Sequence, residues 1–175
     1  MNLEIRIIGD PVLRKKATEV EKFDDELKSI VEEMLPKMYR WDGVGLAAPQ
    51  VGISKRFFVC DDGETQRVVI NPVIKEFLGE DVEIEEGCLS IPGIYSEIKR
   101  PEGVKVEYKD PEGNVIEEEI HGYAARIFQH EFDHLDGILF ADKLSVVAKA
   151  RLKKEINLLI KDGRKKAKEL GEITL

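Results

Sequence analysis

The 175-residue chain has a length typical of one ordinary domain with its own core. Its formal net charge of −8 argues against a nucleic-acid partner held through phosphate contacts, so no specific DNA binding is expected. No stretch approaches the roughly 18 apolar residues of a membrane span. Glu4 and Arg6 interrupt the short apolar N-terminal segment, which is unlike a signal peptide, and we therefore expect a cytoplasmic location with no membrane association.

The N-terminal part of the chain contains one predicted helix, over residues 24–40. Its apolar side chains recur at helical spacing, with Leu27, Ile30, Val31 and Met34 on one face. Asp24 or Asp25 can cap the first turn, and Pro36 is expected to disturb the last turns. The glycine-rich segment WDGVGLAAPQVG that follows is not predicted to be helical.

From residue 55 to residue 106 the pattern changes to strands. The segments RFFVC, RVVINPVI, DVEIEEGCLSI and GVKVEY are short, rich in β-branched or aromatic residues, and separated by Gly, Pro and Asp clusters. The segment EYKDPEGNVIEEEI predicts a hairpin with residues 110–113 as its turn.

Two helices are predicted after these strands. The segment YAARIFQHEFDHLDG is helical in its spacing, and Gly137 is suited to cap its C-terminal end. Residues 145–170 predict an amphipathic surface helix. The chain is therefore expected to be a single α+β domain, residues 1–175, with mostly antiparallel strands around a central HExxH helix. The N-terminal helix and the C-terminal amphipathic helix complete this expected fold.

The segment HEFDHLDG, residues 130–137, predicts a metal site. His130 and His134 lie four positions apart, so on a helix their side chains project side by side and can reach one ion. Glu131 lies beside that line, where its carboxylate can accept a proton from the attacking water, as in HExxH hydrolases. A solvated surface helix is the alternative, but the apolar neighbours Ile127 and Phe128 indicate burial, which favours a metal as partner.

A catalytic metal normally has three protein ligands and an open position, so a third ligand is needed. His121 and Glu155 remain possible on the residues alone. Cys88 is the better candidate because Gly87 lets the chain bend and presents the thiol outward. Cys60 ends an apolar strand and is expected to be a buried structural thiol, with both cysteines reduced.

Three segments together resemble the peptide deformylase family: GVGLAAPQ (residues 43–50), EGCLS (residues 86–90) and HEFDHLDG. They stand in the family's order, and the resemblance extends over about residues 1–145, including the opening GDPVLR. It implies hydrolytic removal of the formyl group from the N-terminal formyl-methionine of newly made polypeptides, with release of formate. The substrate would then be an N-formyl-methionyl peptide on nascent chains at the ribosome.

The resemblance also implies roles for individual residues. Cys88, His130 and His134 would bind the metal, and Glu131 would act as general base and then as proton donor. The Gln50 side-chain amide and the Leu89 backbone N–H would hold the developing oxyanion. The donor set of one sulfur and two imidazoles suits zinc. The resemblance instead points to Fe²⁺, one per chain, with Zn²⁺, Ni²⁺ or Co²⁺ able to substitute.

The substrate is expected to contact two groups of residues. The glycine-flanked segment Gly43, Val44 and Gly45 would let an extended peptide approach the backbone in a strand-like pairing. Walls of an apolar pocket for the methionine side chain are expected from Val44, Ile84, Tyr123 and Ile127. Arg126 lies near the same helix face, and no role is assigned to it.

Two other functions stay open at this point. An HExxH zinc metallopeptidase that cuts internal peptide bonds would use a third ligand other than Cys88. A non-catalytic binding module would hold a structural metal in a closed four-ligand site that could recruit Cys60.

Overall fold

Five strands pair in chain order into one antiparallel sheet in the computed structural model, which describes residues 3–175. Each strand is hydrogen-bonded to the next one along the chain, from β1 to β5. The strands are β1 (Gly45–Ala47), β2 (Phe57–Asp61), β3 (Gln66–Cys88), β4 (Ile91–Lys109) and β5 (Val115–His121).

Strands β3 and β4 are far longer than expected. The segments RVVINPVI and DVEIEEGCLSI are predicted as separate strands, but RVVINPVI and DVEIEEGC form the single strand β3. Leu89 and Ser90 of the second segment lie in a turn, and Ile91 already begins β4. Register shifts between Ile70 and Val73 and between Leu78 and Asp81 absorb the breaking residues, and bulges of this kind bend a strand. The predicted hairpin is confirmed, since β4 and β5 pair across a turn in which Gly113 N–H donates to Asp110 O.

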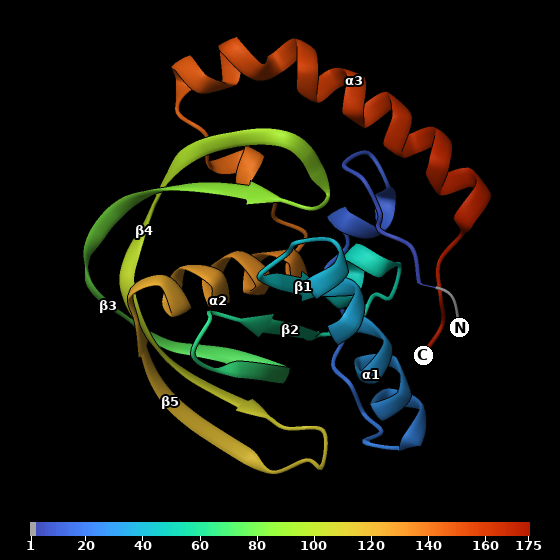
Figure 1. Cartoon of the computed structure of the whole chain (residues 1–175), viewed down its shortest axis with the longest axis vertical. Helices are drawn as coiled ribbons and strands as arrows, with labels where there is room; N and C mark the ends of the chain where they lie inside the picture. The colour runs from blue at the N-terminus through green and yellow to red at the C-terminus, as the bar shows by residue number, and fades with distance from the viewer. Residues whose placement is uncertain (1–2) are drawn as a thin grey trace.

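The helix α2 (Gly122–Leu135) lies in the arc formed by β3, β4 and β5 (Figure 1). Its apolar side chains, including Phe128 and Leu135, join a buried cluster with Phe58, Val69 and Val104 of the sheet. Gly137 follows the helix with a φ of +74°, and its N–H donates to His134 O, as expected for a C-terminal cap. The predicted central HExxH helix is confirmed.

The helix α1 (Asp25–Arg40) matches the first predicted helix. The Asp24 side chain accepts a hydrogen bond from Leu27 N–H and caps its first turn. The helix continues past Pro36 for one more turn, to Arg40. Its buried face packs with β1 and β2 in a second cluster that includes Leu27, Met34 and Leu46.

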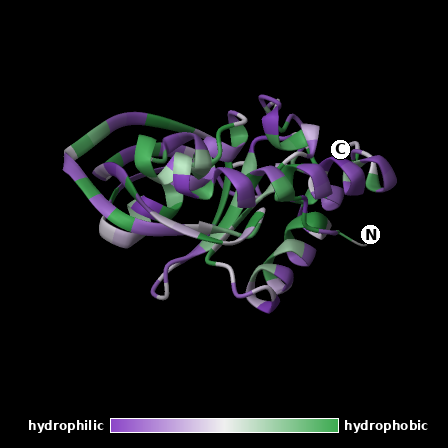
Figure 2. Ribbon diagram, turned by 90° about the horizontal axis from the view of Figure 1, so that it is seen from above, coloured by the Kyte–Doolittle hydropathy of each residue, from purple (hydrophilic) through white to green (hydrophobic). Residues whose placement is uncertain are grey.

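The helix α3 (Val146–Leu170) is the predicted C-terminal helix, and Ser145 caps its first turn. In Figure 2 its ribbon alternates between hydrophilic and hydrophobic residues. It packs closely on the N-terminal segment, because a Cβ at Gly163 would overlap Ile8 O and a Cβ at Gly9 would overlap Ile160 O. Three short 3₁₀ helices complete the fold, at Pro11–Arg14, Ala48–Val51 and Phe140–Lys143.

None of the helices within residues 3–175 is both long enough and apolar enough to cross a bilayer.

Candidate metal centre

Cys88, His130 and His134 converge in the structure, as the sequence predicted. Cys88 is the last residue of β3, and both histidines project from α2. Their ligand atoms all lie within 4.8 Å of one another, and Cys88 Sγ lies 3.4 Å from His134 Nε2. The β3–β4 pairing changes register between Gly87 and Cys88, and irregularities of this kind bend a strand locally.

The other candidate ligands lie elsewhere. His121 is exposed at the end of β5, where its two ring nitrogens are hydrogen-bonded to Glu102 and Glu119. Cys60 is buried in the apolar cluster under α2, and burial raises the pKa of its thiol to about 12. Both cysteines are free, as expected. Glu155 is exposed on α3, and neither it nor His121 nor Cys60 belongs to the converging group.

The donor set fits a transition metal with an open coordination position. One sulfur and two imidazoles are three ligands of the kind used in catalytic zinc and iron sites. The two histidines are buried, and His134 Nδ1 has no hydrogen-bond partner among the described residues. Burial lowers the pKa of His134, which favours the neutral imidazole that a metal requires. Burial also opposes the charged form of His130, but its hydrogen bonds to Cys88 and Glu86 outweigh burial and raise its pKa.

Glu131 is buried beside the two histidines. Its Oε2 lies 4.0 Å from His130 Nε2, and its Oε1 lacks a hydrogen-bond partner among residues 3–175. Burial raises the pKa of its carboxyl group to about 7, although His130 acts in the opposite direction. Gly45 makes room for it, because a Cβ at position 45 would lie 2.7 Å from Glu131 Cδ.

The side chain of Gln50 points toward the same group. Its Oε1 accepts a hydrogen bond of 2.9 Å from Ala47 N–H, which fixes the orientation of the amide. Its Nε2 lies 3.6 Å from Cys88 Sγ and donates to Ser90 Oγ at 3.1 Å. Leu89, the next residue after Cys88, lines a cleft together with Gln50 and Cys88.

A cleft of about 570 Å³ opens beside the converging group and is lined by Cys88, His130 and Glu131, with His134 buried behind it. Gly43, Val44, Gly45, Tyr123 and Ile127 line it, as expected from the sequence. Ile84 does not line it; it is paired with Ile98 in the β3–β4 ladder, one position before the lining begins at Glu85. Further lining residues that the sequence did not suggest are Trp41, Asp42, Glu85, Pro92 and Tyr95.

Sequence reasoning also missed the role of Glu86, although it lies two residues before Cys88. Its carboxylate is buried and accepts hydrogen bonds from Arg100 Nε at 2.6 Å and Arg126 Nη1 at 2.8 Å. It also contacts His130 Nδ1 at 2.8 Å. Burial opposes ionisation, but these partners outweigh it and lower the pKa of Glu86 to about 2.

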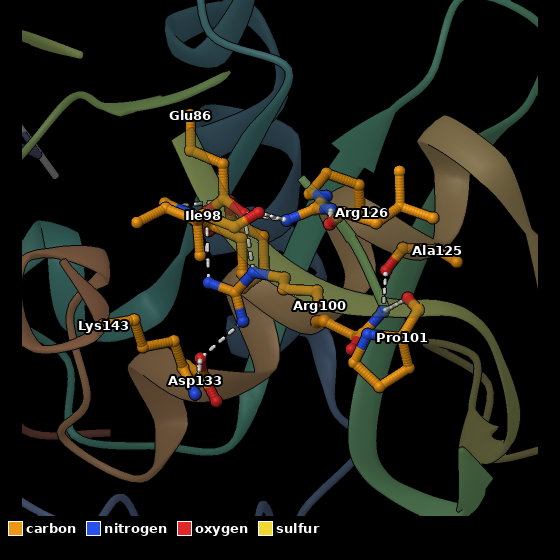
Figure 3. Close-up of polar contacts among 12 residues, drawn as sticks. Glu86, Ile98, Arg100, Pro101, Ala125, Arg126, Asp133 and Lys143 are labelled. Atoms are coloured by element: carbon orange, nitrogen blue, oxygen red, sulfur yellow. Dashed lines mark hydrogen bonds and ion pairs between the residues drawn. The ribbon is translucent and has the colours of Figure 1, made fainter. Parts of the chain in front are cut away.

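Figure 3 shows how Arg100 and Arg126 approach Glu86. Arg126, to which no role had been assigned, also donates to the backbone oxygens of Ile98 and Val82. Arg100 reaches from β4 to Asp133 Oδ2 on α2 at 2.8 Å. The network therefore ties the helix that carries both histidines to β3, which ends at Cys88, and to β4, which carries Arg100.

Comparisons with known proteins identify the family of the chain. The sequence model of the polypeptide deformylase family matches residues 2–150. A peptide deformylase of Thermotoga sp. (strain RQ2) is 55% identical over 152 residues, which cover 87% of this chain and 93% of the relative. A peptide deformylase of Fusobacterium nucleatum is 46% identical over 98% of this chain and 100% of its own length.

Solved structures give the same result for the fold. The crystal structure of peptide deformylase from Thermotoga maritima superposes with a TM-score of 0.81 at 56% identity, covering 83% of this chain and 99% of that one. The enzyme from Thermus thermophilus gives a TM-score of 0.87 at 46% identity, covering 93% and 100%. This chain belongs to the polypeptide deformylase family, metal-dependent hydrolases that remove the N-formyl group from new polypeptides.

Proposed function

We propose that Cys88, His130 and His134 hold one Fe²⁺ ion, which Zn²⁺, Ni²⁺ or Co²⁺ can replace. The single observation that carries this proposal is the convergence of Cys88 with both histidines of the HExxH helix, with the three ligand atoms within 4.8 Å. The thiol lies on β3 and the imidazoles lie on α2, so their convergence is not a consequence of nearness in sequence. When bound there, the metal would supply Lewis acidity to the carbonyl oxygen and to the attacking water.

Glu131 is proposed as the proton carrier of the reaction. Its carboxylate accepts a proton from the water whose oxygen attacks the formyl carbon, and it then donates that proton to the leaving nitrogen. The C–N bond breaks, and the products are formate and the free amine of the polypeptide. The raised pKa of Glu131 suits a group that must both accept and release a proton near neutral pH.

The formyl oxygen is proposed to be held by two N–H donors as negative charge develops on it. Gln50 Nε2 is preoriented by the hydrogen bond between its own Oε1 and Ala47 N–H. The Leu89 backbone N–H directly follows Cys88 and completes the pair. Donors fixed before the reaction stabilise the tetrahedral oxyanion without having to reorganise.

The peptide is proposed to lie along the cleft as an added strand. Gly43, Val44 and Gly45 would pair with its backbone, since two of them have no side chain to block its approach. Val44, Tyr123 and Ile127 would contact the methionine side chain. Tyr123 and Val44 are largely exposed, so a substrate side chain would bury apolar surface that is open to water.

We also propose that residues 1–175 act as one deformylase domain, located in the cytoplasm and acting on nascent chains at the ribosome, without specific DNA binding. The single sheet and the packing of α3 on the N-terminal segment support the domain assignment. The net charge of −8 argues against DNA as a partner.

The experiment that tests this function measures metal content and formate together. Protein purified without oxygen and loaded with iron, nickel or cobalt is expected to release formate from formyl-Met-Ala-Ser. Cys88→Ala is expected to lose both the metal and the activity, whereas Cys60→Ala, the matched control, keeps both. Full metal content in Cys88→Ala would favour the HExxH metallopeptidase, and formate release by none of the three metal forms would refute the proposal.

A further inference from the structure

The two histidines of the metal centre have different surroundings on the side of the ring away from the cleft. His130 Nδ1 lies 2.8 Å from Glu86 Oε1. His134 Nδ1 is equally buried but has no hydrogen-bond partner among the described residues. Among the described residues, a hydrogen bond at Nδ1 therefore constrains the ring of His130 but not the ring of His134.

We propose that Glu86 is a positioning residue that holds His130 in its Nδ1-protonated tautomer, so that the Nε2 lone pair faces Cys88 and His134. A carboxylate can only accept a hydrogen bond, so it selects the proton on Nδ1 and leaves Nε2 free. This inference rests on the proposed metal site and deepens it. Carboxylates in this position orient histidine ligands and raise their basicity.

The two arginines make Glu86 suitable for this task. Arg100 Nε and Arg126 Nη1 both donate to Glu86 Oε2, and Arg100 Nη2 donates to Oε1 at 3.1 Å. Arginine has no acceptor atom, so its donors keep their direction. They hold the carboxylate in one orientation, with Oε1 left to face His130 (Figure 3 shows both arginines and Glu86).

The same geometry predicts what happens when Glu86 is replaced by glutamine. The amide group of Gln would be opposed by two arginine donors at the Oε2 position but by only one at the Oε1 position. The amide nitrogen is therefore expected to occupy the Oε1 position and to donate to His130 Nδ1. His130 would then carry its proton on Nε2, the atom that the metal needs.

The variant Glu86→Gln should therefore be compared with Glu83→Gln. Glu83 lies on the same strand and forms only an exposed ion pair of 3.9 Å with Lys99. Titration with Co²⁺ against a chelator is expected to show a dissociation constant about 10- to 100-fold higher for Glu86→Gln. The affinity of Glu83→Gln is expected to equal that of the wild-type protein.

The tautomer itself is measured by long-range ¹H–¹⁵N correlation spectra of the metal-free proteins, which contain only three histidines. At a pH at which His130 is neutral, the ring is expected to be Nδ1-protonated in the wild type and Nε2-protonated in Glu86→Gln, with His134 unchanged. A purely structural role for Glu86 would not switch the tautomer. An Nδ1-protonated His130 in Glu86→Gln, or unchanged Co²⁺ affinity, would overturn the proposal.

The wild-type protein provides a second test that does not depend on a variant that folds. Its neutral His130 ring must carry the proton on Nδ1 both without metal and with zinc bound, and a neutral ring protonated on Nε2 alone would overturn the inference. Wild-type protein that binds no Co²⁺ would instead refute the proposed metal site. The failure of the metal site and the failure of the positioning role are thus told apart.

Discussion

Gly45 lies directly against the Glu131 carboxylate. A Cβ at position 45 would be 2.7 Å from both Glu131 Cδ and Glu131 Cγ, closer than real side chains approach. The strand β1 therefore packs against one side of Glu131, the proposed proton carrier. Gly45, the second glycine of the GVGLAAPQ segment, is required by this packing as well as by the approach of a substrate.

The Gly45→Ala variant is expected to displace Glu131 and to lower kcat/KM about 100-fold, because a shift of about 1 Å in a catalytic group costs this much. The metal content should not change, because the three atoms nearest to a Cβ at position 45 all belong to Glu131 and none belongs to a proposed ligand. Gly43→Ala is the matched comparison. Its Cβ would meet the flexible end of Leu89, so a smaller loss is expected, and equal losses would contradict this explanation.

The two cysteines are expected to differ in reactivity. Burial raises the pKa of Cys60 to about 12, so its thiolate is scarce at neutral pH. Cys88 is partly exposed and lines the cleft. Iodoacetamide is therefore expected to modify Cys88 alone in the metal-free protein, and bound metal should protect it, as measured by peptide mass spectrometry. Modification of Cys60 before Cys88 would contradict this explanation.

The helix α3 is expected to depend on Gly163. In an ordinary helix, Gly→Ala stabilises by about 1 kcal/mol. Here the new methyl group would overlap Ile8 O and lie 2.7 Å from Ile7 O, so Gly163→Ala is expected to destabilise by about 1–3 kcal/mol. Thermal unfolding measures the difference, with the exposed Asn157→Ala as control. A raised Tm in Gly163→Ala would mean that α3 does not pack on the N-terminal segment.

His121 is expected to titrate independently of the metal centre, as a surface group paired with two glutamates. Hydrogen bonds to Glu102 and Glu119 raise its pKa above the ordinary value for histidine. Its charged form therefore stabilises the fold below the unfolded-state pKa, and this contribution disappears as the pH rises through the raised folded-state pKa. NMR titration of Glu102→Gln should show a lower pKa for His121. If metal loading abolished the titration of His121, this histidine would be a ligand after all.

The residues proposed to bind the metal could be predicted from the sequence because they lie in short local motifs. The spacing of His130 and His134 on a helix defines half of the metal site, and the bend at Gly87 indicates how Cys88 is presented. Their convergence is confirmed by the structure. The N-terminal ends of α1 and α3 were also predictable, because Asp24 and Ser145 are capping residues next to the first helical turn.

The surroundings of the site could not be predicted, because they depend on the register between distant strands. The contact of Arg100 with Glu86 follows from the β3–β4 ladder, which contains several register shifts that the sequence does not reveal. The same ladder places Tyr95 opposite Gly87 in the cleft and leaves Ile84 outside it. A shift of one residue would exchange the two faces of these strands.

The central claim is that Glu131 carries the proton in a hydrolysis assembled around Cys88, His130 and His134. The most direct measurement is formate release from formyl-Met-Ala-Ser by the anaerobic, iron-loaded wild type and by Glu131→Gln at equal metal content, with Glu155→Gln as the surface control. The account predicts that Glu131→Gln binds the metal but loses activity by at least about 100-fold, whereas Glu155→Gln is unaffected. Undiminished formate release by the metal-loaded Glu131→Gln variant would contradict it.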